Sequence, residues 1–222
     1  GAVAVGGLSN LTLQGVIDGN GRLTKGGAAD LSLTGVNTYS GGTFLNGGSI
    51  TIGNAGALGS GDLTVGGGAS LTGSTPLALG NAIHLNAGLT LPGSSALTLG
   101  GMIDGMAGLT KTGAGTLTLS GANTYGGGTT LDNGTLIVAS NTALGTGALT
   151  AAGGTSLDSS SAVTLTNGVN TNFGGLNVLG SHDLTLKGTI AGGGGLTKNG
   201  SATLTLAGAN TYAGNTQVNA GA

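Results

Sequence analysis

The chain has no cysteine, no tryptophan and no glutamate, and only 5% of its 222 residues are charged. Without cysteine, neither disulfides nor thiolate metal sites can form. The five basic residues are scattered and the formal net charge is −2, so no basic patch is available for nucleic acid or an anionic membrane surface. No apolar run approaches the roughly 18 residues of a membrane-spanning helix, which excludes helical membrane insertion by this segment.

Glycine is abundant instead, with 52 residues against 2 prolines, and 38% of the residues are hydrophobic. Low charge combined with many aliphatic residues is the reverse of the composition that keeps chains disordered. The sequence contains no signal peptide, so we expect a segment of a longer precursor.

The chain repeats itself with a long period. Leu23-Thr24-Lys25 recurs as Leu109-Thr110-Lys111 and Leu196-Thr197-Lys198, and Asn-Thr-Tyr recurs at residues 37–39, 123–125 and 210–212. Both elements show offsets of 86 and then 87 residues. We therefore predict a single domain over residues 1–222 that contains two and a half copies of one unit, at about 2–87, 88–174 and 175–222.

A shorter period of about 20 residues lies inside this unit. Short alternating segments such as Leu-Thr-Leu, bounded by Gly, Asn and Ser, are typical of β-strands. The spacing predicts a ladder of Leu97, Leu117, Ile137 and Leu157, and it divides the unit into four 20-residue rungs plus a six-residue insertion. Three short strands per rung indicate an all-β fold, a right-handed parallel β-helix or β-solenoid, on the order of 50 Å long.

The segment from Gly108 to Leu131 resembles the autotransporter-associated β-strand repeat, also called the passenger-associated transport repeat. Degraded copies lie at residues 22–45 and 195–218. The resemblance implies an autotransporter passenger domain that is exported and displayed outside a Gram-negative cell or at its outer-membrane surface. It also implies that the repeat assists translocation and folding, and that the rod acts as a stalk or adhesin.

Few residues carry catalytic chemistry. The seven aspartates are spread along the chain, and most have no counterpart in the next copy: Asp18, Asp30, Asp62, Asp104, Asp132, Asp158 and Asp183. His84 corresponds to Asn170 and His182 to Ser95, so we interpret both imidazoles as surface groups. The turn Asp18-Gly19-Asn20-Gly21 lacks the tandem copies of a calcium roll. We therefore expect no catalytic, cofactor or metal residues, and no enzyme.

Two side chains persist in all three copies, namely Lys25, Lys111 and Lys198, and Tyr39, Tyr125 and Tyr212. We expect each lysine to protect a strand edge and each tyrosine to cover a corner with its hydroxyl in water. Outward hydroxyls are expected to form one ladder through Thr12, Ser32, Thr51, Thr72, Thr98 and Thr118.

These observations predict a structural or adhesive segment of a surface-displayed protein. Its partners would be neighbouring rungs or copies of itself, and a host-cell or matrix receptor or glycan. The alternative is a self-assembling extracellular filament whose subunits stack end to end. A β-helical carbohydrate-active enzyme and an ice-binding protein are disfavoured, because the carboxylates are dispersed and the hydroxyl ladder breaks at Ile137 and Asp158.

Overall fold

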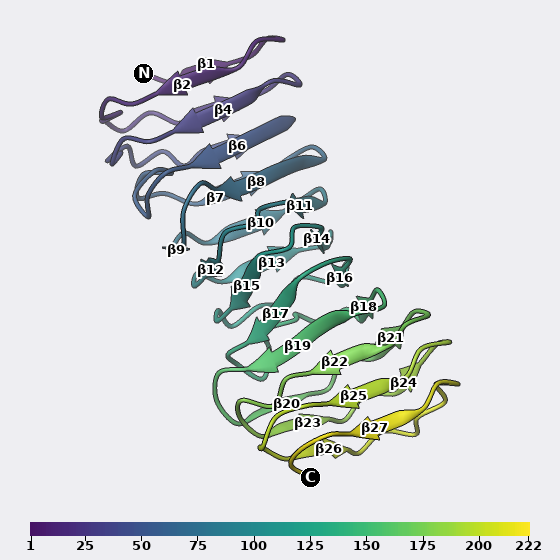
Figure 1. The fold of residues 1–222 in the computed structure, drawn as a ribbon. Coiled ribbons are helices and arrows are strands. Elements are labelled where there is room, and N and C mark those ends of the chain that lie inside the picture. The colour runs from purple at the N-terminus through teal and green to yellow at the C-terminus, as the bar shows by residue number, and fades with distance from the viewer.

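The computed structural model describes residues 1–222 and contains 27 short strands and no helix. The strands stack along one axis, from β1 near the N-terminus to β27 near the C-terminus (Figure 1). Every strand pair is parallel, and most partners are 20 residues apart. This confirms the predicted β-solenoid. No helix has the length and apolar character needed to cross a bilayer.

Each rung has three sides. Side A carries a six-stranded sheet of β1 (Val3–Val5), β3 (Leu23–Lys25), β5 (Thr43–Leu45), β7 (Leu63–Val65), β10 (Ile83–Leu85) and β13 (Ile103–Gly105), and later a three-stranded sheet of β20 (Val163–Leu165), β23 (Leu184–Leu186) and β26 (Leu204–Leu206). Two rungs without a strand on this side, near residues 123 and 143, separate these sheets. They are joined to their neighbours by backbone hydrogen bonds such as Thr124 N to the Ile103 oxygen, 2.8 Å.

Side B is a ten-stranded sheet of β2 (Leu11–Leu13), β4 (Asp30–Leu33), β6 (Gly48–Ile52), β8 (Ala69–Gly73), β11 (Leu89–Leu91), β14 (Leu109–Lys111), β16 (Thr129–Leu131), β18 (Leu149–Ala151), β21 (Val169–Thr171) and β24 (Ile190–Ala191). Side C is an eight-stranded sheet of β9 (Leu77–Leu79), β12 (Leu97–Leu99), β15 (Thr116–Leu119), β17 (Thr135–Val138), β19 (Thr155–Ser159), β22 (Leu176–Val178), β25 (Leu196–Lys198) and β27 (Thr216–Val218).

The core runs along the inside of the coil. Because side chains in a strand alternate between faces, the first and third residues of a Leu-Thr-Leu strand point inward and the middle residue points out. Leu97 and Leu99 are buried while Thr98 is partly exposed, and 42 buried hydrophobic residues form one continuous cluster. Each buried leucine contributes roughly 1.5 to 3 kcal/mol before entropy. Stability is thus distributed over contacts between neighbouring rungs.

The predicted ladder on side C is wrong at one position. Leu117 pairs with Leu136, not with Ile137, and Leu136 pairs with Leu157. Ile137 lies between Thr118 and Asp158 on the outer face and is partly exposed. The rung between residues 117 and 136 has 19 residues, and a shift of one residue turns a side chain to the opposite face.

The sequence predicted that the six extra residues of the long repeat are an insertion, and this prediction is wrong. They complete one further side of the coil. The Leu-Thr-Lys strand is β3 on side A in the first copy, β14 on side B in the second and β25 on side C in the third. An 86-residue unit therefore spans about four and one-third rungs, so each copy starts one side further around the axis.

The Asn-Thr-Tyr segments follow the same rotation. The backbone amide of Thr38 donates to Ile17, that of Thr124 to Ile103 and that of Thr211 to Ile190. The first segment takes the place of a strand on side C, the second on side A and the third on side B. The segment without a strand therefore lies on a different side of the coil in each copy of the repeat.

Candidate functional site

The repeat carries a set of polar side chains inside the coil. The lysine ends a three-residue strand, so alternation turns it to the same inner face as the leucine two residues earlier. Lys25, Lys111 and Lys198 are only 1 to 2% exposed. The expectation that these lysines protect a strand edge from the outside is wrong, because their place in the alternation directs them inward.

Each buried ammonium joins two successive rungs. Lys111 Nζ donates to the carbonyl oxygens of Gly113, 2.5 Å away, and Asn133, 3.1 Å away. The other two copies make the same contacts at two and 22 residues further along the chain, namely Lys25 with Gly27 and Gly47, and Lys198 with Gly200 and Ala220. The lysine therefore supplies donors to corner carbonyls that lack a backbone partner. Burial lowers the pKa of Lys25 and of Lys111, and Asp30 partly opposes this at Lys25.

The asparagine of Asn-Thr-Tyr joins three rungs. Asn123 Oδ1 accepts a hydrogen bond from Ile103 N, 2.8 Å, and its Nδ2 donates to the Ala143 oxygen, 2.7 Å. Asn37 makes the equivalent bonds to residues 17 and 57, and Asn210 Oδ1 accepts from Ile190 N. In each case the amide replaces backbone pairing where no strand is present.

The tyrosine lies under the same corner. Tyr39 and Tyr125 are 1% and 0% exposed, and their hydroxyls share hydrogen bonds of 2.5 and 2.6 Å with Oγ1 of Thr43 and Thr129. The expectation of a hydroxyl in water is therefore wrong for these two residues. Burial raises the pKa of Tyr125 to about 12 and raises that of Tyr39, against the opposing effect of the threonine hydrogen bond. We call the lysine, the asparagine and the tyrosine–threonine pair of each copy the repeat clamp.

The outer face of side A carries one cluster of titratable groups. His84 Nδ1 lies 2.7 Å from Asp104 Oδ1, and its Nε2 lies 3.2 Å from Asp62 Oδ2. Hydrogen bonding to Asp104, and secondly to Asp62, raises the pKa of His84. These three residues are 22 and 20 positions apart, so the rung period itself contained the signal that they meet in space.

A hollow of about 320 Å³ lies beside this cluster. It is lined by Ser40, Gly41, Gly42, Phe44, Gly61, Asp62, Thr64 and His84. The guanidinium of Arg22 lies over the Phe44 ring, 5.1 Å from its centroid, and does not line the hollow. Arg22 thus makes a cation–π contact with the ring from the preceding rung, and Phe44 lines the hollow.

The remaining acids and the second histidine lie apart from this cluster. Asp158 is only 7% exposed and accepts hydrogen bonds from the backbone amides of Ser159 and Ser181 and from the Ser181 hydroxyl, so its role is structural. Asp30 accepts from Ser49 and Thr51. His182 is exposed, with Nδ1 2.9 Å from the Ser159 oxygen. Asp18, Asp132 and Asp183 are exposed, and no group of three potential metal ligands forms.

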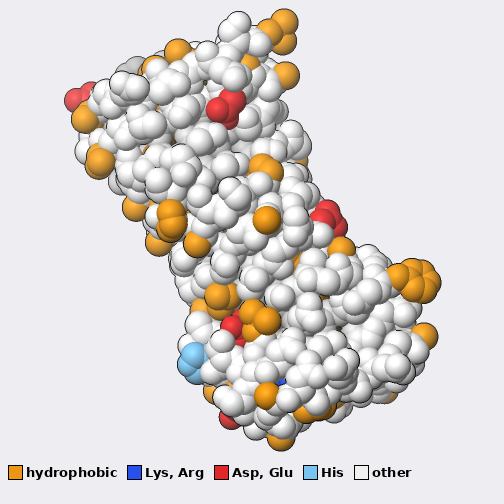
Figure 2. Space-filling view, viewed as in Figure 1, with side chains coloured by type: hydrophobic (Ala, Val, Ile, Leu, Met, Phe, Trp, Pro, Cys, Tyr) orange, Lys and Arg blue, Asp and Glu red, His pale blue; other side chains and the backbone are white.

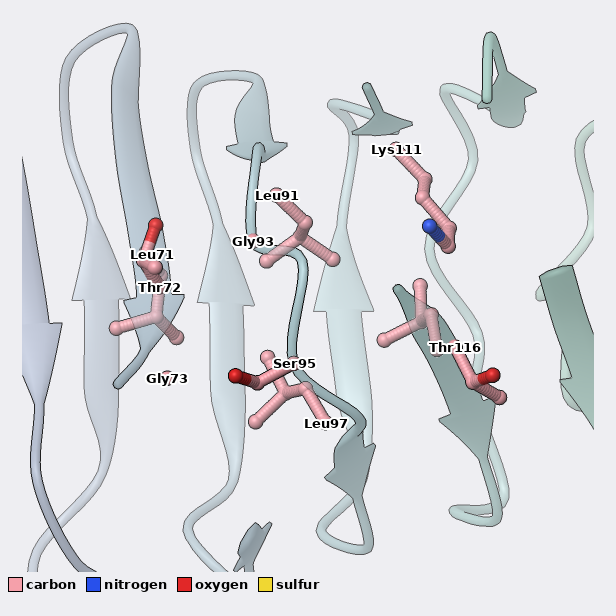
Figure 3. A pocket seen from close by; sticks show the side chains of 10 residues that line it. Leu71, Thr72, Gly73, Leu91, Gly93, Ser95, Leu97, Lys111 and Thr116 are labelled. Atoms are coloured by element: carbon pink, nitrogen blue, oxygen red, sulfur yellow. The ribbon is translucent and has the colours of Figure 1, made fainter. Parts of the chain in front are cut away.

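A second hollow lies inside the coil near Lys111. Its volume is only about 10 Å³, room for about one water molecule, and it lies among Leu91, Ser95, Leu97 and Thr116 (Figure 3). This space is too small for an organic ligand.

The predicted single hydroxyl ladder is divided between two faces. Thr12, Ser32, Thr51 and Thr72 pair on side B, whereas Thr98 and Thr118 pair on side C. A longer ladder lies beside the first on side B and consists of Ser49, Ser70, Thr90, Thr110, Thr130 and Thr150 in unbroken register. All six are partly exposed, and only Ser49 uses its hydroxyl within the chain, toward Asp30.

The surrounding surface is nearly uncharged. Figure 2 shows a face made mostly of backbone and neutral polar atoms, with isolated hydrophobic side chains and few charges. Such a surface offers repeated weak contacts along the rod.

The fold and the three repeat clamps define a repetitive β-solenoid. Residues 23–52, 109–138 and 196–222 match the passenger-associated-transport-repeat, so the chain carries three of these repeats. They correspond to β3–β6, β14–β17 and β25–β27. The repeats and the solenoid fit an autotransporter passenger domain. No curated protein and no solved structure gave a match to the chain.

Proposed function

We propose that the chain is a non-catalytic segment of a surface-displayed passenger, and that it acts as a rigid stalk and adhesin outside a Gram-negative cell. The observation that carries the adhesive part is the ladder on side B from Ser70 to Thr150, which presents unpaired hydroxyls on successive rungs. At a rung spacing of about 4.8 Å these groups form a regular line of weak donors and acceptors.

Binding along such a line strengthens by multivalency. Each hydroxyl contributes little, but contacts made by one rod to one surface act together once the first has formed. The receptors that suit this geometry are host-cell or matrix molecules with repeated polar groups, glycans among them. The repeat clamps support the stalk role, because they fix the register of neighbouring rungs at the corners where strand pairing is interrupted.

The adhesive role can be tested with beads coated with the purified chain. Attachment to epithelial cells and to matrix proteins is compared for the wild type and for a variant in which Thr90, Thr110, Thr130 and Thr150 become valine, which keeps the strand-favouring branched shape. A matched control changes Thr98, Thr118, Thr135 and Thr197 on side C in the same way.

We expect the side B variant to lose most of its attachment while the side C control retains it, with unchanged melting temperatures. If wild-type beads attach no better than albumin-coated beads, the adhesive role is contradicted and only the role of a stalk remains. Fibres that form in solution, grow with protein concentration and are detected by sedimentation in the ultracentrifuge would favour the filament alternative.

A further inference from the structure

The hollow on side A occurs at a corner that the repeat builds twice with the same backbone. In the first copy Asn81 Nδ2 donates to the oxygens of Gly59 and Gly61, at 3.1 and 2.7 Å. In the second copy Asn167 Nδ2 donates to Gly145 and Gly147, at 3.0 and 2.7 Å. The two corners therefore have one architecture, and what differs between them is the set of outward side chains.

The outward residues of the two corners differ at all five positions. Arg22, Phe44, Asp62, His84 and Asp104 in the first copy correspond to Gly108, Thr130, Ala148, Asn170 and Ala191 further along the chain. Only the first corner forms a hollow of about 320 Å³. The inner residues that build the fold are kept, while a charged and aromatic group is present on the outside of one copy alone. Folding does not require this group, since the second corner folds without it.

The groups around the hollow match a small polyhydroxylated ring. Phe44 provides an aromatic surface, and electron-poor C–H groups of a pyranose pack favourably against such a surface. Asp62 Oδ1 makes no hydrogen bond within the chain, since His84 contacts only Oδ2. The Thr64 hydroxyl and the backbone amides of Gly42 and Gly61 also lack partners within the chain. The hollow thus combines one apolar wall with free donors and acceptors, the pattern of a small-ligand site.

The charges favour a neutral ligand. His84 contacts the carboxylates of both Asp62 and Asp104. The side chains of Asp62 and His84 are 59% and 35% exposed. Arg22 contacts the Phe44 ring and does not line the hollow, and the His84 imidazole is paired with Asp62 and Asp104, so no free cation is available to pair with a sugar carboxylate. An acidic sugar would instead meet Asp62.

We propose that the hollow between Phe44 and His84 binds one pyranose residue of a neutral glycan. This site rests on the proposed adhesive function and gives it a ligand class. It would add one specific contact to the repeated contacts of side B, on an adjacent side of the rod. No bond of the sugar is made or broken in this role.

The test uses saturation-transfer difference NMR on the purified chain. The probes are glucose, galactose, mannose and N-acetylglucosamine with their β-linked disaccharides, and glucuronic acid and sialic acid as the acidic arm, all at millimolar concentration. We expect signal from at least one neutral sugar. Phe44→Ala should weaken that binding by about tenfold or more, as should Asp62→Ala, while Phe173→Ala, at an exposed phenylalanine outside the hollow, changes nothing.

A second variant keeps the inference open to refutation if Phe44→Ala also disturbs the fold. Thr130→Phe, Ala148→Asp, Asn170→His and Ala191→Asp together, in the Phe44→Ala background, should restore sugar binding at the second corner. Gly108 is left unchanged, because a Cβ there would lie 2.6 Å from the Gly128 oxygen.

Four results would overturn the site: no neutral sugar binds, only acidic sugars bind, binding survives both single variants, or the transplanted residues fail to restore it. New anomeric signals from a cleaved disaccharide would overturn the non-catalytic role instead. Because soluble sugars are used, loss of the site is distinguishable from loss of the proposed function. Beads that still attach to cells through side B would keep the function and reject only this glycan site.

Discussion

Lys111 and Asn133 lie on successive rungs and are joined by a hydrogen bond of 3.1 Å from the buried ammonium to the backbone oxygen. The same bond recurs between Lys25 and Gly47, on a different side of the coil. The lysine of the repeat is therefore an internal link between rungs that rotates around the axis with each copy.

Lys111→Met tests this link. Methionine fills much of the same volume but leaves the oxygens of Gly113 and Asn133 without their donor, and a buried unsatisfied polar group costs about 1 to 3 kcal/mol. Two oxygens are affected, but methionine also removes the cost of burying the ammonium, so urea unfolding should show a net loss of about the size for one group. Lys187→Met, at an exposed position, is the matched control and should change stability by less than about 0.5 kcal/mol. Equal stability of the two variants would mean that the buried ammonium contributes nothing.

Asn123→Ala tests the asparagine of the clamp. The change removes both the acceptor for Ile103 N and the donor to the Ala143 oxygen, so two buried backbone groups lose partners. We expect a loss of about 2 to 6 kcal/mol, twice the cost of one such group. Asn172→Ala, an exposed asparagine, serves as control. Hydrogen exchange should also show faster exchange at Ile103 in the first variant, and protection retained there would argue against the bond.

Leu117→Asp and Thr118→Asp test the assignment of faces on adjacent residues. Leu117 is buried between Leu97 and Leu136, so a carboxylate there would be unpaired in an apolar ladder. Thr118 points outward and should tolerate the change. The first variant should unfold or lose several kcal/mol in thermal denaturation. Similar melting temperatures would show that the faces are inverted.

The contribution of His84 depends on pH. Its folded-state pKa is raised by Asp104 and Asp62, so its stabilising effect is fully present below the unfolded-state pKa of about 6.5 and is lost as pH rises through the raised value. His84→Asn takes the residue of the second copy and removes the titrating group. The stability difference between wild type and variant should be larger at pH 5.5 than at pH 9. A difference that grows with pH would have the wrong sign for this cluster.

The sequence predicted the solenoid well because its main signals are local. Alternation and glycine-bounded strands place Leu97, Leu117 and Leu157 correctly inside. The error at Ile137 arose because a fixed period cannot detect a 19-residue rung followed by a longer one. The buried Lys111 was missed because lysine is almost never fully buried, although its position two residues after Leu109 put it on the inner face.

The candidate sites were harder to predict for a different reason. Asp62, His84 and Asp104 come together only through the register of three rungs, and Phe44 joins them from a fourth. Their spacings of about 20 residues agree with the rung period, but the sequence does not show which way each corner directs its side chain. The rotation of the repeat was likewise concealed, because six residues read equally as an insertion or as one side of a coil.

The most direct test of the account is the dependence of attachment on rod length. Deleting residues 110–196 joins Leu109 to Thr197, removes one whole unit and leaves the Phe44 site intact. We predict that beads carrying this shortened chain lose more attachment to cells than beads carrying Phe44→Ala, with both proteins showing a β-sheet circular dichroism spectrum and cooperative melting. Unchanged attachment of the shortened chain, together with complete loss in a folded single-residue variant, would contradict adhesion by repeated contacts.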